Sequence, residues 1–294
     1  MPSTRDIRRR IKSVKNTSQI TKAMEKVAQA KMAKAQQAAI SGRAYAALMN
    51  RVLAEVVTHA GDFDHPFMES RGGNRRALIL VTTDKGLCGA LNTNLLRKVS
   101  VDFVAESTQV ISAGRKGALH ATRSGWDLTA EFSFSDPPSI GEARVITKAA
   151  VDLFESGQVD HVDIAFTNFI NTITQKPEVQ TLLPITEIKA VSAGVEGEET
   201  AVTLSGGTTE FLFEPSADGV LGELLPHYLN FQVHQILLEN RASEHSARMV
   251  AMKNATDNAN QLIKDLTLKY NKLRQAAITN ELLEITSAQM ALGN

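Results

Sequence analysis

The chain lacks features that mark several protein classes. Its 294 residues include one cysteine, Cys88, so no internal disulfide can form. Aromatic residues make up only 5% of the sequence, and no run of eighteen apolar residues is present, which excludes a conventional transmembrane helix. With 43% hydrophobic and 22% charged residues, the composition is that of a globular protein with one large domain or two smaller ones.

Negative charge is scarce at the N-terminal end, although the whole chain has a formal net charge of zero. Residues 1–60 contain 12 Lys or Arg and 3 Asp or Glu. Such a segment is typical of a surface that faces an acidic partner, which can be a protein, a nucleic acid or a membrane. A solvated helix face is the alternative interpretation.

Helix-breaking residues are also scarce there. Between residues 4 and 59 there is no proline and one glycine, Gly42, which predicts a single helix roughly 80 Å long. Its apolar stripe, at alternating steps of three and four, is formed by Ile7, Ile11, Val14, Ser18, Thr21, Glu25, Ala28, Met32, Ala35 and Ala39. The polar members in the middle predict that the seam shifts locally onto Ile20, Met24 and Val27.

The C-terminal end repeats this pattern. From Ala217, past a possible kink at Pro226, a helix is predicted to about Ser287, which is longer than the first helix by about 15 residues, or roughly 22 Å. Its stripe is formed by Met249, Met252, Thr256, Ala259, Ile263, Leu266, Tyr270, Leu273, Ala277, Asn280 and Glu284. Each helix has one narrow apolar seam, so we expect the two to pair as an antiparallel coiled coil. Two helices of an ordinary bundle are the alternative.

The excess length predicts an unpaired segment at the end of the second helix. We define the C-terminal tip as residues 282–294, LLEITSAQMALGN. Its apolar residues are Leu282, Leu283, Ile285, Met290 and Leu292. A single helix with this much apolar surface requires a binding site on another molecule.

Between the two helices, strand and helix patterns alternate from residue 75 to 188. A closing hairpin is predicted around Gln175, Lys176 and Pro177. The predicted fold is therefore α+β overall: a long antiparallel two-helix coiled coil from the termini, plus an inserted α/β, Rossmann-like domain with a largely parallel sheet. The predicted divisions are residues 1–59 for the first helix, 74–209 for the α/β domain and 210–294 for the last helix and its tip.

The segment TTDKGLCGALN, residues 82–92, follows the first predicted strand, where many enzymes bind phosphate. Its glycines, Gly86 and Gly89, match neither G-x-G-x-x-G nor a P-loop. The seven histidines show no H-E-x-x-H motif, and Cys88 has no predicted base beside it. We therefore predict no catalytic residues, no cofactor and no metal.

Three segments together resemble the gamma subunit of the F-type ATP synthase. They are residues 4–32, TRDIRRRIKSVKNTSQITKAMEKVAQAKM; residues 82–92, TTDKGLCGALN; and residues 243–285, which open with SEHSARMVAM and close with RQAAITNELLEI. The resemblance covers nearly the whole chain. It implies a non-catalytic central rotor shaft that transmits torque between a membrane rotor ring and a hexameric ring of catalytic subunits in a proton-translocating ATP synthase.

The resemblance also implies partners and contact residues. The partners are three alpha and three beta subunits, the epsilon subunit and the membrane c-ring. The positions matching the family's shaft contacts are Met24, Arg248, Gln275, Thr279 and Glu281. We add two hypotheses: a basic face that biases the catalytic subunits, and a bearing made by the tip residues Leu282, Leu283, Ile285 and Met290. The basic face is formed by Arg8, Arg9, Arg10, Lys12, Lys15 and Lys22.

Alternatives remain. A basic coiled coil that binds nucleic acid predicts aromatic residues among the basic ones, yet residues 1–40 contain none and Tyr45 is the first. An α/β enzyme with accessory helices is a further alternative. The Arg-rich start resembles a targeting peptide, but the shaft motif begins almost at residue 3, so we expect no cleaved leader. The expected location is peripheral, on the cytoplasmic face of a bacterial inner membrane, with no direct membrane span and no nucleic-acid partner.

Overall fold

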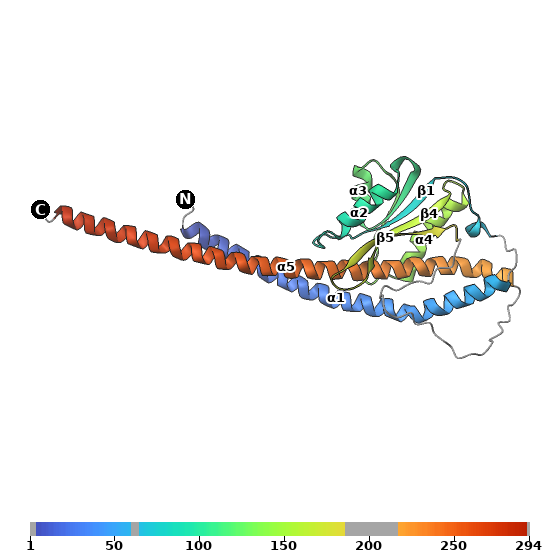
Figure 1. The fold of residues 1–294 in the computed structure, drawn as a ribbon, viewed down its shortest axis with the longest axis horizontal. Coiled ribbons are helices and arrows are strands. Elements are labelled where there is room, and N and C mark those ends of the chain that lie inside the picture. Colours follow the sequence, from blue (N-terminus) through green and yellow to red (C-terminus); the bar gives the residue numbers. More distant parts are fainter. Residues whose placement is uncertain (1–3, 60–64, 186–216, 293–294) are drawn as a thin grey trace. The chain divides into compact units, whose positions relative to one another are not determined.

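The computed structural model describes residues 4–59, 65–185 and 217–292. Two long helices, α1 (Thr4–His59) and α5 (Ala217–Leu292), come from the two ends of the chain (Figure 1). Both helices are those that the sequence predicts, and α5 continues past the expected end near Ser287. No strong helix breaker lies between Ser287 and Gly293, which explains the extra length.

The chain divides into two compact units, and each long helix contributes to both. The first unit contains Met1–Val27 and Met249–Asn294, and is a pair of helical segments. The second unit, Ala28–Arg248, contains the rest of α1 and α5 together with the sheet and its helices.

The second unit contains a five-stranded sheet with the order β3-β2-β1-β4-β5. Pairings among β1 to β4 are parallel, and β5 is antiparallel to β4, so the predicted largely parallel sheet is confirmed. The strands are β1 (Arg76–Val81), β2 (Thr108–Ala113), β3 (Asp127–Phe132), β4 (His161–Phe169) and β5 (Gln175–Leu183). The shorter helices are α2 (Leu91–Asp102), α3 (Arg115–Arg123) and α4 (Ile140–Glu155), with 3-10 turns η1 (Pro66–Met68) and η2 (Ala105–Ser107).

Apolar side chains cover the sheet on both faces. On one face, Ile79 of β1 belongs to a core with Phe154 of α4 and Leu237 of α5. On the other face, Leu80 of β1 belongs to a smaller core with Leu95 of α2. Central strands of a parallel sheet are buried in this way, because helices cover both faces. The α5 segment of this unit is therefore part of the larger core.

The predicted hairpin turn is wrong in position. Gln175, Lys176 and Pro177 lie in β5, and the turn comes before them. There, the Asn171 side-chain oxygen accepts hydrogen bonds from the backbone N–H groups of residues 173 and 174, at 2.9 and 2.7 Å. Asparagine stabilises turns by such bonds. Pro177 is tolerated in β5 because that strand is at the sheet edge.

Helix α4 begins with a complete capping box. Ser139 Oγ accepts a hydrogen bond from the backbone N–H of Glu142, and the Glu142 carboxylate accepts one from the Ser139 N–H at 2.7 Å. These reciprocal bonds satisfy donors that the first turn of a helix leaves open. The same carboxylate accepts the backbone N–H of Ser135 at 2.7 Å, which fixes the preceding loop.

None of the helices, within the residues that the structure describes, is both long enough and apolar enough to cross a bilayer.

Candidate functional site: the helical seam, the tip and the loop anchor

In the first unit, polar residues join α1 to α5, and three of them, Ser18, Thr21 and Thr256, are buried. The hydroxyl oxygens of Thr21 and Thr256 lie 2.7 Å apart, and Ser18 Oγ donates to Asn260 Oδ1 at 2.9 Å. These two pairs run in opposite directions along the two helices, so the segments are antiparallel. Ile7 is buried further toward the N-terminus of the same seam. The predicted antiparallel coiled coil is confirmed here.

The predicted seam shift is wrong. Ser18 and Thr21 are buried, whereas Ile20 and Val27 are 60% and 57% exposed. Met24 and Glu25, the remaining two residues of that prediction, are both half-buried. The polar residues keep their seam positions because residues of α5 satisfy their hydrogen bonds. No local change of helical pitch is needed to avoid them.

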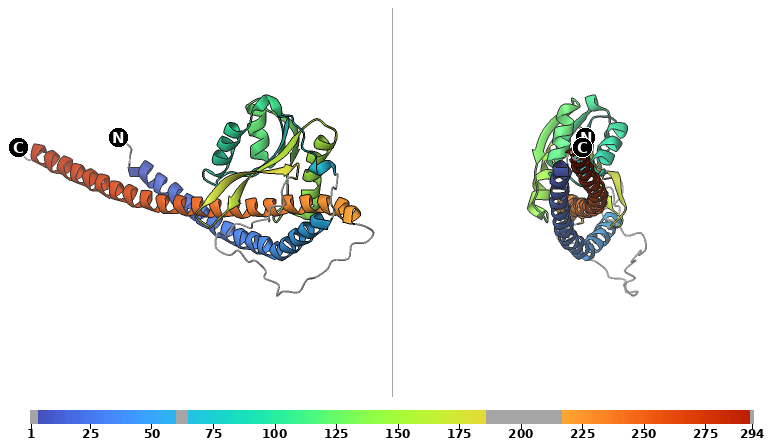
Figure 2. Two further views of the ribbon diagram at one scale, coloured as in Figure 1. Left: turned by 45° about the vertical axis from the view of Figure 1, so that its right-hand side comes forward. Right: turned by 90° about the vertical axis from the view of Figure 1, so that its left-hand side faces the viewer.

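The end of α5 extends past the start of α1 within this unit (Figure 2). Continued to the start of α1, the register set by the two pairs places Thr4 opposite residue 273 or 274. The helix beyond that point is about 18 residues long, or roughly 27 Å. All side chains described from residue 274 to 290 are exposed.

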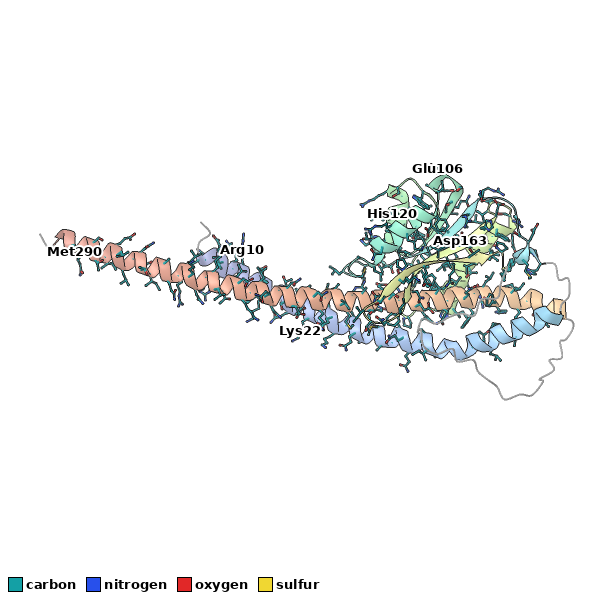
Figure 3. All side chains as sticks on the ribbon, in the orientation of Figure 1. Arg10, Lys22, Glu106, His120, Asp163 and Met290 are labelled. Carbon is teal, nitrogen blue, oxygen red and sulfur yellow. The ribbon has the colours of Figure 1, made fainter. Side chains whose placement is uncertain are left out.

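The predicted tip residues are therefore exposed in the chain alone. The exposed fraction is 57% for Leu282 and reaches 79% for Met290, which Figure 3 labels near the end of α5. Leu283 and Ile285 are exposed as well. The side chain of Leu292 is outside the described set.

The predicted basic residues of α1 all face outward. Figure 3 shows Arg10 and Lys22 projecting from the helix. Arg9 pairs with Asp6 at 2.8 Å, and both side chains are solvent-accessible, so this pair adds little stability. The exposed basic side chains are Arg8, Arg9, Arg10, Lys12, Lys15 and Lys22. They lie in the first unit and can meet a partner without rearrangement.

The five residues predicted as shaft contacts have different surroundings. Met24 is half-buried, and Gln275, Thr279 and Glu281 are exposed. Thr279 Oγ1 donates to the Gln275 carbonyl at 2.9 Å, one turn earlier in α5. Arg248 belongs to the second unit and is mostly buried, so the structure does not collect the five into one cluster.

Arg248 holds the loop that contains TTDKGLCGALN. Its guanidinium donates to the carbonyl oxygens of Gly86 at 3.2 Å and Lys85 at 3.4 Å, and to Glu244 Oε1 at 2.8 Å. The loop connects β1 to α2, and Arg248 belongs to α5. The glycine turn is therefore a docking point between the α/β part and α5.

Arg241 precedes Arg248 by seven residues in α5 and also attaches this loop to the helix. It donates to Asp84 Oδ2 at 3.2 Å, to Glu244 Oε2 at 2.6 Å and to the Phe134 carbonyl at 2.6 Å. Its guanidinium also lies 4.0 Å from the centre of the Phe134 ring. Burial by itself lowers the pKa of this guanidinium. The carboxylates of Glu244 and Asp84 raise the pKa by more than burial lowers it, so the net shift of the pKa is upward. Arg241 therefore stays charged.

Sequence reasoning missed Arg241, Glu244 and Asp84. The sequence spacing indicates only the ion pairs within α5, since residues 241 and 244 are spaced i,i+3 and residues 244 and 248 are spaced i,i+4, with opposite charges. The contact with Asp84 joins residues 157 positions apart and has no local signature. Asp84 also accepts from the backbone N–H of Arg115 at the start of α3, at 3.2 Å.

The loop has the geometry of a structural turn. The Cys88 thiol is buried and lies 3.4 Å from Asn92 Nδ2, and Asn92 also contacts Thr83. Leu87 adopts a positive φ of 63°, which closes the turn between the two glycines. Among the described residues, no group of three or more His, Cys, Asp and Glu side chains is placed to hold a metal ion.

Comparisons with known proteins agree with this architecture. The family model described as ATP synthase matches residues 3–292. The ATP synthase gamma chain of Opitutus terrae is 48% identical over 99% of both chains, and that of Methylacidiphilum infernorum is 42% identical over the full length of both.

Solved structures show the same fold. A chain in the F1/c-ring structure of Euglena gracilis mitochondrial ATP synthase aligns with a TM-score of 0.67 at 20% identity, covering 98% of this chain and 94% of its own. A chain in the central stalk/c-ring structure from Tetrahymena thermophila mitochondrial ATP synthase gives a TM-score of 0.61 at 23% identity, covering 80% and 99%. The fold is thus one that occurs in chains of the ATP synthase. More specifically, the chain belongs to the ATP synthase gamma chain family.

Proposed function

We propose that this chain is the non-catalytic central rotor shaft of a proton-translocating F-type ATP synthase. It transmits torque between the membrane c-ring and the ring of three alpha and three beta subunits. The observation that carries this proposal is the antiparallel seam of α1 and α5, from which an exposed apolar helix end extends. Family membership supports the same role, and it gives no support to the nucleic-acid alternative.

We propose a separate role for each segment that the sequence predicts. Residues 1–59 and 210–294 form the shaft, and residues 74–209 form a foot that binds the epsilon subunit and the c-ring. The subunit is peripheral, on the cytoplasmic face of a bacterial inner membrane. The hydrogen bonds of Arg241 and Arg248 support a foot that is attached to the shaft, because they join the α/β part to α5.

The proposed mechanism is a bias that moves around the ring. One asymmetric rod cannot make equal contacts with three identical catalytic subunits, so each subunit is held in a different conformation. Shifting a two-state subunit from 1:99 to 99:1 requires roughly 5.5 kcal/mol of differential contact energy. Six exposed cations on α1 can supply this energy when they meet acidic surfaces, and rotation passes the bias to the next subunit.

Two sets of residues complete the proposal. Met24, Arg248, Gln275, Thr279 and Glu281 are coupling contacts with the alpha and beta subunits. Leu282, Leu283, Ile285 and Met290 form a bearing, because an apolar helix end in an apolar sleeve makes few directional bonds and meets low barriers to rotation. Arg248 reaches a ring subunit only through the part of its side chain that Glu244 and the loop leave accessible.

Charge reversal on the basic face tests the function. In the assembled complex, changing Arg8, Arg9, Arg10, Lys12, Lys15 and Lys22 to Glu is expected to lower ATP-driven proton pumping relative to ATP hydrolysis. The matched control exchanges Arg8, Arg9 and Arg10 for Lys and Lys12, Lys15 and Lys22 for Arg, which keeps the charge of the face, and it is expected to keep the ratio. Unchanged coupling in the six-residue variant contradicts the proposed role of this face.

Copurification tests the assignment as a central shaft independently of the role of the basic face. The tagged chain is expected to bring down three alpha and three beta subunits per copy, together with the epsilon subunit. Recovery in any other ratio contradicts the assignment as a central shaft.

A further inference from the structure

A histidine lies buried inside the charged network that attaches the α/β part to α5. His245 is 4% exposed, and its Nε2 lies 3.1 Å from Asp136 Oδ2 in the loop between β3 and α4. Its Nδ1 lies 3.4 Å from Nη1 of Arg248. The Asp136 carboxylate also accepts from Lys31 Nζ of α1 at 2.8 Å. His245 thus connects Arg248, which holds the 84–86 loop, to Asp136, which belongs to the loop between β3 and α4.

These contacts define the protonation state of the imidazole. A guanidinium nitrogen can only donate, so Nδ1 must accept from Arg248 and the proton of the neutral ring must be on Nε2, where it is donated to Asp136. A second proton on Nδ1 removes the acceptor that the imidazole offers to Arg248. It also brings two cations together in a buried site.

We propose that His245 makes the attachment of the 84–86 loop and the 134–136 loop to α5 sensitive to pH, firm with a neutral imidazole and loosened when a proton binds. This pH sensitivity goes beyond the shaft role, since it concerns contacts between two loops and α5 within one chain and does not require partner subunits.

The ion-paired side chains around His245 balance one another without a charge on the imidazole. Three cations and three anions belong to the network, and they come from α1, from both loops and from α5. The cations are Lys31, Arg241 and Arg248, and the anions are Asp84, Asp136 and Glu244. Two further titratable residues lie beside the 134–138 segment: Glu142 of α4, which holds Ser135, and His234 of α5, whose Nε2 lies 3.2 Å from the Pro138 carbonyl oxygen.

The direction of the pKa shift agrees with this geometry. Burial is the largest cause and lowers the pKa of His245 below its ordinary value of 6.5, and Arg248 lowers it further. Asp136 and Glu244 raise it in part without reversing the shift. A base whose pKa is lowered in the attached state binds a proton more readily in the open state. The attachment is therefore at full strength above pH 6.5 and weakens as the pH falls below that value.

Hydrogen exchange on the full-length chain tests the proposal. Exchange is followed by mass spectrometry in peptides covering residues 84–90 and 134–139, at about pH 7.5 and about pH 5.5, and corrected for the intrinsic pH dependence of exchange. Opening of these segments is expected to increase at the lower pH by up to roughly tenfold, the limit for one pH unit below an ordinary histidine pKa. His245→Gln keeps a donor for Asp136 and cannot be protonated, so its opening is expected to be independent of pH.

His227→Gln is the matched control, because His227 is exposed on the same helix. It is expected to retain the pH response of the unchanged chain. Equal opening at both pH values in the unchanged chain, or an undiminished response in His245→Gln, overturns the proposal. An NMR titration of His245 in the unchanged chain requires no variant. A measured pKa at or above 6.5 contradicts the proposed direction.

Discussion

The hydroxyl oxygens of Thr21 in α1 and Thr256 in α5 lie 2.7 Å apart, buried between two helices that come from opposite ends of the chain. Each hydroxyl also contacts a carbonyl of its own helix, Ser18 for Thr21 and Met252 for Thr256. A polar pair inside an apolar seam favours one register over others, since any slip separates the two hydroxyls and leaves them buried without each other.

The threonine pair yields a stability prediction. Thr21→Val or Thr256→Val alone is expected to lower the free energy of unfolding by about 1 kcal/mol, because one buried hydroxyl loses its partner. The double variant is expected to lose less than the sum of the two. A double-mutant cycle from chemical denaturation measures this coupling. Strict additivity contradicts an energetic link across the seam.

Arg241 is expected to be far more important to stability than another arginine with a similar ion pair. Arg241→Ala leaves the buried Glu244 carboxylate without its closest cation and is expected to cost about 3 to 5 kcal/mol. Arg9→Ala, which removes the solvent-accessible pair with Asp6, is expected to cost less than about 1 kcal/mol. Urea denaturation of both variants makes the comparison. Similar losses in the two variants contradict the anchoring role assigned to Arg241.

Two glycines with positive φ differ in their surroundings. Gly114 has φ 116°, and a Cβ there meets the carbonyl oxygen of Thr82, whereas Gly125 has φ 73° and open space beside it. Gly114→Ala is expected to cost about 3 kcal/mol or more, from backbone strain plus a clash. Gly125→Ala is expected to cost about 1 kcal/mol, from strain alone. Thermal denaturation of the two variants compares these losses of stability. Equal losses contradict a close approach of the Thr82 backbone to Gly114.

Glu142 is expected to contribute to acid sensitivity. Burial by itself raises its pKa, but hydrogen bonds from Ser139 and Ser135 outweigh burial and lower the pKa below the ordinary value of 4.5. A carboxylate with a lowered pKa stabilises the fold above its unfolded pKa, and this stability is lost as the pH falls below about 4.5 and through the folded value. Glu142→Gln is expected to flatten stability against pH in that range. An unchanged acid slope contradicts the assignment.

Local patterns were sufficient to predict the large elements. The absence of proline between Thr4 and His59 and the two apolar stripes predicted α1, α5 and their pairing, because helix propensity and periodicity act over neighbouring residues. The alternation of strands and helices predicted the mostly parallel sheet in the same way. The exposed tip followed from the difference in length between the two helices.

Features that depend on distant partners were not predicted. Ser18 and Thr21 looked unsuitable for the seam because their partners Asn260 and Thr256 are over 230 positions away. The sequence favours a turn around Gln175, Lys176 and Pro177 because proline is a stronger local turn signal than Asn171, whose role depends on side-chain hydrogen bonds. The attachment of Asp84 to Arg241 likewise required the fold.

The apolar end of α5 is exposed in the chain alone, and we expect the alpha and beta subunits to enclose it in the complex. Hydroxyl-radical footprinting of residues 282–290, in the isolated chain and in the assembled complex, tests it most directly. Leu282, Leu283, Ile285 and Met290 are expected to be labelled in the isolated chain and strongly protected in the complex. Labelling of these residues to the same extent in both states contradicts the account.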